Sequence, residues 1–181
     1  QLLTLARPFK LRRESWPLSM LVAGVVELLE PEAAQSGVNI KLQISDDAVI
    51  EGDKAGLHQM LMNLCVNALH AMETEGQLSI ESLSETAERD DKVFIGLRIS
   101  DTGPGIAPEH LPHVFDPFFT TKEIGKGTGL GLSVSRRIIE EHDGWIEAAN
   151  GIQRGAVFTC WLPQAVSKSQ VRGQTTSNAA H

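Results

Sequence analysis

Three things that the sequence has little of narrow its class. Lys and Arg number 16 against 23 Asp and Glu, a formal net charge of -7, so it has no basic surplus for broad nucleic-acid binding. It contains no run of about 18 apolar residues and no apolar signal segment, so we expect neither a transmembrane helix nor secretion. Its two cysteines, Cys65 and Cys160, stand in apolar surroundings, which predicts buried thiols in a reducing, cytoplasmic compartment. Whether a parent protein is anchored in the inner membrane is left open by the sequence.

The length and composition predict one globular domain with less ordered ends. The chain has 181 residues, 41% of them hydrophobic, which is enough for one buried core and too little for two. Residues 1–11 begin with a helix-like apolar pattern that stops at Pro8, so we expect the end of an upstream helix there. Residues 165–181 are polar and predict a disordered tail. Residues 12–164 remain as the domain.

The spacing of apolar residues predicts alternating helices and strands, and thus an α/β fold. Helical spacing covers residues 17–37, 54–72 and 130–142. Alternation at period two predicts strands at 38–45, 76–85, 92–100, 145–150 and 156–163. The charged stretch 85–92 is expected to join two of these strands as a hairpin connection.

The predicted helix over residues 54–72 carries an unusual polar stripe. Asn63, Asn67 and His70 share one face, while the opposite stripe is apolar and predicts core. Asparagine is a mediocre helix former, so two of them four residues apart call for a reason. A capping or surface role is one explanation. The other is that both amides face a polyanionic ligand, with one amide oxygen completing the octahedron of a magnesium ion that phosphates already hold.

The segment DTGPGI directly follows the predicted strand 92–100. It places Asp101 at the strand end and Gly103 and Gly105 in a tight turn behind it. A carboxylate there can accept a hydrogen bond from the exocyclic amine of adenine, whereas guanine would present an oxygen to it. The two glycines would let the backbone approach a flat base.

A phenylalanine-rich segment, FDPFF, precedes a glycine-rich loop. Its phenylalanines, Phe115, Phe118 and Phe119, are equally well explained as a core cluster. The loop opens into the helix predicted from residue 130, whose first N–H groups form an anion site, so it is predicted to cover phosphates. Lys122 and Lys126 flank the loop and either contact phosphate or are solvated charges. The loop matches neither the Walker nor the Rossmann glycine pattern.

Taken in order, the asparagine-rich helix, DTGPGI, FDPFF and GTGLGL resemble the N, G1, F and G2 boxes of the histidine-kinase branch of the GHKL ATPases. The resemblance covers roughly residues 16–163, and GDKAGLHQMLMNL and FDPFFTTK are most similar to nitrogen-regulation-type kinases. It implies a Bergerat fold, an α/β two-layer sandwich whose mixed, mostly antiparallel sheet is backed by three helices, which binds ATP and Mg²⁺ under a mobile lid.

The same resemblance implies roles for individual residues. Asn63 and Asn67 would be the catalytic pair, with Asn63 facing the phosphates and Asn67 binding the metal, and Asp101 would read adenine. The other nucleotide-binding residues that these motifs imply are His70, Gly103, Gly105, Ile106, Phe115, Lys122, Lys126, Gly127, Thr128, Gly129, Leu130 and Gly131.

Asn63 favours a kinase over an ATPase. Relatives that hydrolyse ATP carry a glutamate at this position, and an amide cannot take a proton from water, whereas an attacking imidazole needs only positioning. None of the six histidines lies in an H-[ED]-x-x-x-P-like stretch, so the acceptor is expected on a dimerisation domain of the same parent protein, which is expected to be a homodimer. A response regulator is expected to take the phosphoryl group from that histidine. No nucleic-acid partner is expected.

Three positions depart from the family pattern, and two other functions compete with the kinase. Val157 stands where a hydroxyl residue is frequent. His70 stands where many members have a longer polar side chain, and Asp143 stands where a left-handed glycine is common at a helix end. The first alternative function is a nucleotide-sensing module without transfer. The second is a Ser/Thr kinase of the anti-sigma type, which the expected upstream helix argues against.

Overall fold

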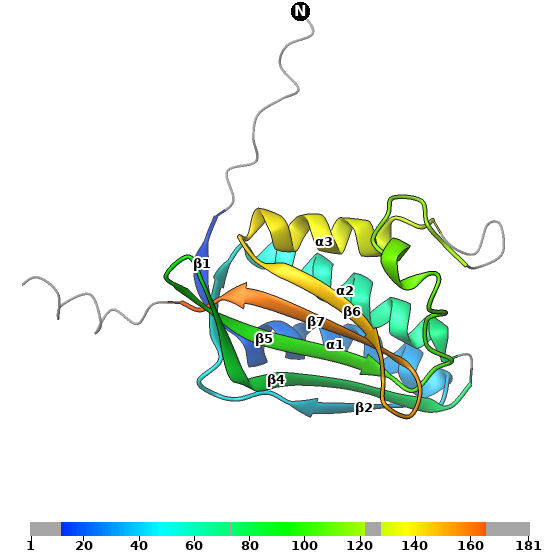
Figure 1. The fold of residues 1–181 in the computed structure, drawn as a ribbon. Coiled ribbons are helices and arrows are strands. Elements are labelled where there is room, and N and C mark those ends of the chain that lie inside the picture. The colour runs from blue at the N-terminus through cyan, green and yellow to red at the C-terminus, as the bar shows by residue number, and fades with distance from the viewer. Residues whose placement is uncertain (1–11, 73, 122–127, 166–181) are drawn as a thin grey trace, which may run out of the picture.

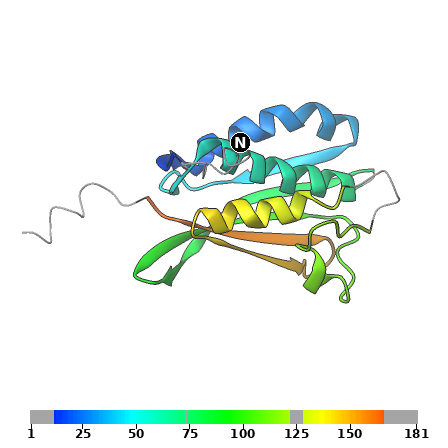
Figure 2. The same ribbon diagram turned by 90° about the horizontal axis from the view of Figure 1, so that it is seen from above.

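The computed structural model describes residues 12–72, 74–121 and 128–165. In this part of the chain, three α-helices cover one face of a five-stranded sheet (Figures 1 and 2). The helices are α1 (Leu18–Gln35), α2 (Lys54–Ala71) and α3 (Gly131–Glu141). The sheet strands are β2 (Val38–Gln43), β4 (Gly76–Arg89), β5 (Lys92–Asp101), β6 (Trp145–Asn150) and β7 (Ala156–Pro163). None of these helices is long and apolar enough to cross a membrane.

The strand order is β2-β4-β5-β7-β6, with β2 parallel to β4 and every other neighbour antiparallel. The predicted α/β two-layer sandwich, with a mixed and mostly antiparallel sheet backed by three helices, is therefore confirmed. Viewed along the sheet, α2 lies between α1 and α3 (Figure 2). Hence α2 touches both other helices.

The hairpin between β4 and β5 is tighter than the sequence suggested. Residues 85–92 were expected to form its connection, but β4 continues to Arg89 and only Asp90 and Asp91 form the turn. Both turn residues have positive φ, 52° and 59°, as a two-residue type I′ turn requires. Most of the charged residues predicted to form a loop are therefore strand residues. They are largely exposed and follow a register shift between Ser82 and Thr86.

A second, two-stranded sheet was not predicted. It consists of β1 (Glu14–Pro17) and β3 (Val49–Gly52), which pair antiparallel. Two contacts attach the chain beyond β7 to this sheet. Gln164 forms a β-bridge with Ile50, and the Ala165 N–H donates to Val49 O at 2.9 Å. Strands of four residues carry too few alternations to be recognised, and their partners here are distant in sequence.

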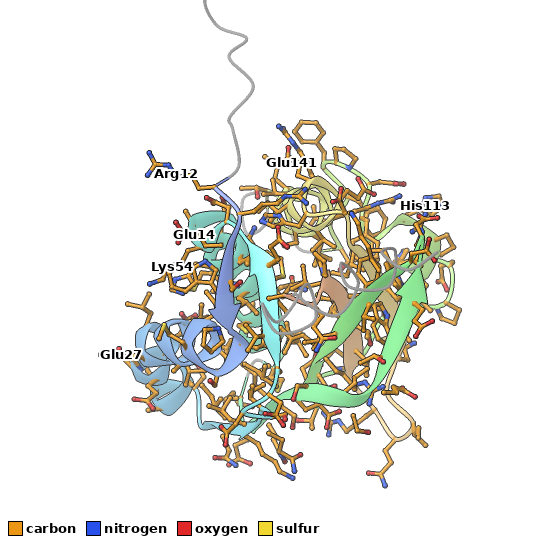
Figure 3. The ribbon with its side chains drawn as sticks, turned by 90° about the vertical axis from the view of Figure 1, so that its left-hand side faces the viewer. Arg12, Glu14, Glu27, Lys54, His113 and Glu141 are labelled. Carbon is orange, nitrogen blue, oxygen red and sulfur yellow. The ribbon has the colours of Figure 1, made fainter. Side chains whose placement is uncertain are left out.

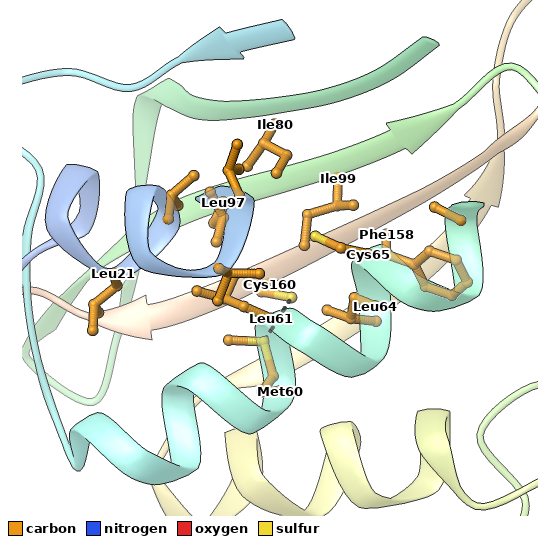
Figure 4. Close-up of a cluster of buried hydrophobic side chains, with 14 of the residues drawn as sticks. Leu21, Met60, Leu61, Leu64, Cys65, Ile80, Leu97, Ile99, Phe158 and Cys160 are labelled. Atoms are coloured by element: carbon orange, nitrogen blue, oxygen red, sulfur yellow. Dashed lines mark hydrogen bonds between the residues drawn. The ribbon is translucent and has the colours of Figure 1, made fainter. Parts of the chain in front are cut away.

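The core lies between the sheet and the three helices and contains both cysteines (Figure 4). Cys65 and Cys160 are fully buried, free thiols, as the sequence predicted, and Cys160 Sγ lies 3.9 Å from Met60 Sδ. Burial raises the pKa of the Cys65 thiol to about 12, so it stays protonated and unreactive at neutral pH.

The C-terminal end of α3 is fastened to its surroundings by polar contacts. The fully buried His142 accepts a hydrogen bond from the Asp53 N–H at Nε2 (2.9 Å) and donates from Nδ1 to Ile138 O (2.6 Å), an arrangement that only the neutral Nδ1–H tautomer can make. Asp143 has a φ of 62°, the left-handed conformation expected for it. Its carboxylate pairs with Arg13 at 2.6 Å, where the chain enters β1; Figure 3 shows this end of the molecule, with Glu14 and Glu141 labelled.

Candidate functional site

The site is assembled at the opposite end of the sandwich, where α2 meets the start of α3. Asp53 caps α2 by accepting from the Gly56 N–H at 2.9 Å, and a stripe of buried apolar residues fixes which face turns outward. Asn63 and Asn67 lie on the outward face, both half-buried. Asn63 Nδ2 donates to Gly131 O at 3.3 Å, whereas the Asn67 amide makes no hydrogen bond within the described residues.

Asp101 ends β5 in a buried position, with 5% of its surface exposed. Its Oδ1 accepts from the Gly103 N–H at 2.8 Å and from the Ala156 N–H at 3.2 Å. In the described part of the chain both bonds end at Oδ1, so Oδ2 is the oxygen that can accept from a ligand. Burial raises the pKa of Asp101, and the two N–H groups and the charge of Arg154 oppose that rise in part.

The glycines behind Asp101 are required by close approach. A Cβ on Gly103 would lie 2.9 Å from Asp101 Oδ1 and 3.0 Å from Ala71 O, at the end of α2. Gly105 has a φ of +82°, a conformation that strongly favours glycine. Ile106 is half-buried and packs against the core, so the turn lies against the end of α2 on one side and the core on the other.

The phenylalanine-rich segment contacts both the core and the glycine-rich loop. Phe115 is half-buried and meets Phe158 edge-on at 6.2 Å, as the core interpretation expects. Phe118 is 74% exposed and has a φ of +66°; its N–H donates to Gly129 O at 2.9 Å. Gly129 also has positive φ, and a Cβ there would overlap the Phe118 backbone. The segment therefore holds the final residues of the loop.

The start of α3 is open towards this site. Leu130, the residue before the helix, is 39% exposed, and its N–H donates to Thr128 Oγ1 at 3.4 Å. No side chain in the described part of the chain caps this helix end. Gly131 O accepts from Ser135 Oγ at 2.9 Å as well as from Asn63. The first N–H groups of α3 can therefore serve an anion.

His70, the last of the predicted residues that the structure describes, makes its observed contact outside this arrangement. His70 Nε2 lies 3.3 Å from Glu32 Oε1 of α1, so its observed partner is a carboxylate on the neighbouring helix. Lys122, Lys126 and Gly127 lie outside the described residues.

Sequence reasoning missed a residue that holds the site together, Asn150 at the end of β6. Its side chain bonds both the N–H and the C=O of Ile106, each at 2.7 Å. The dipeptide Asn150-Gly151 reads as an ordinary turn, so nothing in the sequence pointed to a contact across 44 positions.

Comparison with known proteins assigns the class. A family described as "Histidine kinase-, DNA gyrase B-, and HSP90-like ATPase" matches residues 52–166, more than half of the chain. The chain belongs to this family, as the four motifs indicated. The match contains Asn63, Asp101 and Gly131, so the assembled site falls within the family domain.

Individual relatives are sensor histidine kinases. The sensor histidine kinase ZraS of Salmonella typhimurium is 35% identical over 164 residues, which are 90% of this chain and 34% of ZraS. The nucleotide-free catalytic domain of histidine kinase ThkA superimposes with a TM-score of 0.72 at 31% identity, covering 84% of this chain and 97% of that domain. Full-length ShkA in complex with AMPPNP gives a TM-score of 0.74 at 27% identity, covering 90% of this chain and 33% of ShkA.

The chain spans about a third of the length of the ZraS kinases that it matches. The similarity to nitrogen-regulation-type kinases in particular stays a prediction.

Proposed function

We propose that this chain is the ATP-binding catalytic domain of a sensor histidine kinase. It binds Mg-ATP and transfers the terminal phosphoryl group to a histidine on a dimerisation domain of the parent protein. The observation that carries this proposal is the contact between the Asn63 amide and Gly131 O, because it joins the asparagine-rich helix to the base of the glycine-rich loop beside a buried aspartate.

Adenine recognition is assigned to Asp101 and the turn behind it. Oδ2 would accept a hydrogen bond from the adenine amine, while Gly103 and Gly105 present backbone to the ring. The pKa of Asp101 is raised, but its two N–H bonds favour the ionised, acceptor form. The related ShkA was crystallised with the ATP analogue AMPPNP, which supports nucleotide as the ligand.

Magnesium is assigned to Asn67 together with the nucleotide. The Asn67 amide is half-buried, faces outward beside Asn63 and has no partner in the described residues, so its oxygen fits the oxygen ligation that Mg²⁺ prefers. When bound, the metal would neutralise phosphate charge. The residues of this chain orient the phosphates: the start of α3 supplies N–H donors, and Asn63 holds that start in place.

The amide at residue 63 is the basis for assigning transfer to histidine instead of hydrolysis. An amide cannot accept a proton from water, so it is no general base. In transfer, an imidazole nitrogen forms a bond to the γ-phosphorus, the bond from that phosphorus to the β–γ bridging oxygen breaks, and ADP leaves. Only alignment of the two substrates is required of the protein.

The partners follow from the same proposal. Residues 12–164 would be the catalytic domain of a homodimeric, cytoplasmic kinase. The upstream helix end and the tail predicted for the two ends of the chain fall on residues 1–11 and 166–181, which lie outside the described residues, apart from Ala165, which bonds to Val49. The related ThkA was crystallised with the response regulator TrrA, which supports a response regulator as the phosphoryl acceptor from the histidine.

The test is to mix this chain with radiolabelled ATP and magnesium, with and without a separately produced domain that bears the parent's histidine. The chain alone should bind ATP, label nothing and release little phosphate. Adding the helical domain should give slow, acid-labile labelling, because an untethered acceptor is present only at its solution concentration. Rapid phosphate release by the chain alone would instead indicate an ATPase. Acid-stable phosphoserine on a partner would indicate the anti-sigma type, and binding without any transfer a sensing module.

A further inference from the structure

The turn between β6 and β7 lies against the loop that carries Asp101, although the two are about 50 residues apart in sequence (Figure 1). Asn150, the last residue of β6, makes two hydrogen bonds to the backbone of this loop. Its Oδ1 accepts from the Ile106 N–H at 2.7 Å, and its Nδ2 donates to Ile106 O at 2.7 Å. One side chain thus pairs with Ile106 as a neighbouring strand would.

The rest of the turn reinforces this attachment. Gly155 has a φ of +83°, and a Cβ there would overlap the Asp101 carbonyl. Arg154 Nε donates to Gly103 O at 3.4 Å, and the Ala156 N–H donates to Asp101 Oδ1 at 3.2 Å. The loop is therefore bonded to the turn at its start, its middle and its end.

This attachment matters because residues 102–106 contain no helix or strand and two glycines. A free backbone of this kind loses conformational entropy when a ligand orders it, and that loss weakens binding. Asn150 orders Ile106 before any ligand binds, and the fit is close, since a Cβ on Gly105 would lie 2.9 Å from Asn150 Oδ1. A preordered loop leaves more of the interaction energy for the ligand.

We propose that Asn150 is a positioning residue for base recognition: it holds the backbone at Ile106 so that Asp101 and the glycine turn keep the geometry that accepts adenine. This rests on the proposed function, in which Asp101 reads the base. Asparagine suits the task because one planar group offers a donor and an acceptor side by side, whereas Asp offers two acceptors when ionised and Ala offers neither.

Three variants test the proposal. Asn150→Ala removes both bonds, and Asn150→Asp keeps the shape and the acceptor but sets a carboxylate oxygen against Ile106 O. Asn39→Ala, on the exposed edge strand β2, is the matched control. Calorimetry is run with Mg-ATP, with adenosine and with magnesium tripolyphosphate, after circular dichroism has shown that each variant is folded.

The split between ligands is the decisive readout. Both Asn150 variants should bind Mg-ATP and adenosine about tenfold more weakly, a loss of about one net hydrogen bond, and should bind tripolyphosphate within about twofold of the original chain. The control should bind all three unchanged. A merely structural role would lower tripolyphosphate affinity as well, and that result would overturn the proposal.

Two further results would also overturn it. If Asn150→Asp bound adenosine as the original chain does, shape alone would suffice and the paired hydrogen bonds would have no role. If Asn150→Ala lost no ATP affinity, the loop would not depend on residue 150. Should the unaltered chain bind neither adenosine nor ATP, the proposed function itself fails. That outcome is separate from every other, because it is seen before any substitution is made.

Discussion

The two ends of β5 and α3 are held in different ways. At the end where β5 begins and α3 finishes, the Asp143 carboxylate forms ion pairs with Arg13 at 2.6 Å and Lys92 at 3.4 Å, and both ring nitrogens of His142 bond to backbone groups. At the other end, the side chains of Asp101, Asn63 and Asn150 hydrogen-bond to backbone groups. The Asp101 carboxylate there still has one oxygen, and Asn67 its whole amide, without a partner among the described residues.

This difference separates support from binding. A polar group that is already bonded within the protein adds rigidity but has no capacity left for a ligand. Close packing of backbone at a glycine, such as Gly155 against the Asp101 carbonyl, fixes a loop without occupying its side chains. The end with unused donors and acceptors is thus the end prepared for a ligand, and substitutions at the two ends should differ in whether stability or binding suffers.

The largest effect is expected at the supporting end, on stability. His142→Ala removes a buried ring and leaves the Asp53 N–H without an acceptor, so the free energy of unfolding should fall by about 2–4 kcal/mol. Urea unfolding measures this. His113→Ala is the matched control, since His113 is exposed and its pair with Asp116 should contribute under about 1 kcal/mol.

ATP affinity of the folded His142→Ala fraction should change less than about threefold. A large loss of affinity without loss of stability would contradict the division between the two ends.

Asp101→Asn should do the reverse, weakening binding while increasing stability. Its Oδ1 can still accept the two N–H bonds, which turns an NH₂ donor towards the adenine amine at a cost of about 1–3 kcal/mol in ATP binding. Competition between ATP and GTP should become less selective. Asp46→Asn, at an exposed carboxylate before β3, should leave both ligands unaffected.

The stability gain should depend on pH in a defined direction. The pKa of Asp101 is raised in the folded chain, so as pH rises past the ordinary aspartate range the unfolded chain ionises first and the original protein loses stability. The variant has no such loss. The difference in unfolding free energy should therefore be near zero at acid pH, where both states are protonated, and grow towards neutral pH. Equal stability of the two proteins at neutral pH would mean that the buried charge costs nothing.

The sequence predicted the parts whose cause is local. The three helices, the five sheet strands and the left-handed Asp143 follow from periodicity and from one residue's conformational tolerance, and the structure confirms them. The placing of Asp101 at a strand end was also local. The contact between Asn150 and Ile106, the pairing of β1 with β3 and the partner of His70 are not, because each depends on which distant segment folds alongside.

Asn67→Ala should separate metal binding from base binding at the end of the molecule that holds the site. The substitution removes a proposed metal ligand and leaves the adenine turn intact, so Mg-ATP affinity should fall by about 1 kcal/mol, or roughly fivefold. Without magnesium, ATP affinity should be unchanged. Calorimetry with and without the metal measures both. An equal loss in the two conditions would remove Asn67 from the metal site, and Asn39→Ala again serves as the control.

The smallest effect is expected at Asp143, where two contributions oppose each other. Its left-handed conformation costs about 1 kcal/mol relative to glycine, and its half-exposed ion pairs with Arg13 and Lys92 contribute about 0.2–1 kcal/mol each. Asp143→Gly relieves the strain and loses the pairs, so its net change should be near zero. Asp143→Ala loses the pairs and keeps the strain, and should be about 1 kcal/mol less stable than the original chain.

The pH dependence of unfolding distinguishes these contributions. Arg13 lowers the pKa of Asp143, chiefly through their hydrogen bond, so its contribution is present above the ordinary aspartate range and disappears as pH falls through the lowered value. At that acid limit Asp143→Gly should be the more stable protein, because only the relief of strain remains, and the gap should close as pH rises. Urea unfolding between acid and neutral pH, repeated in high salt, follows this change. A constant gap would mean that the ion pairs of Asp143 at this end contribute nothing to stability.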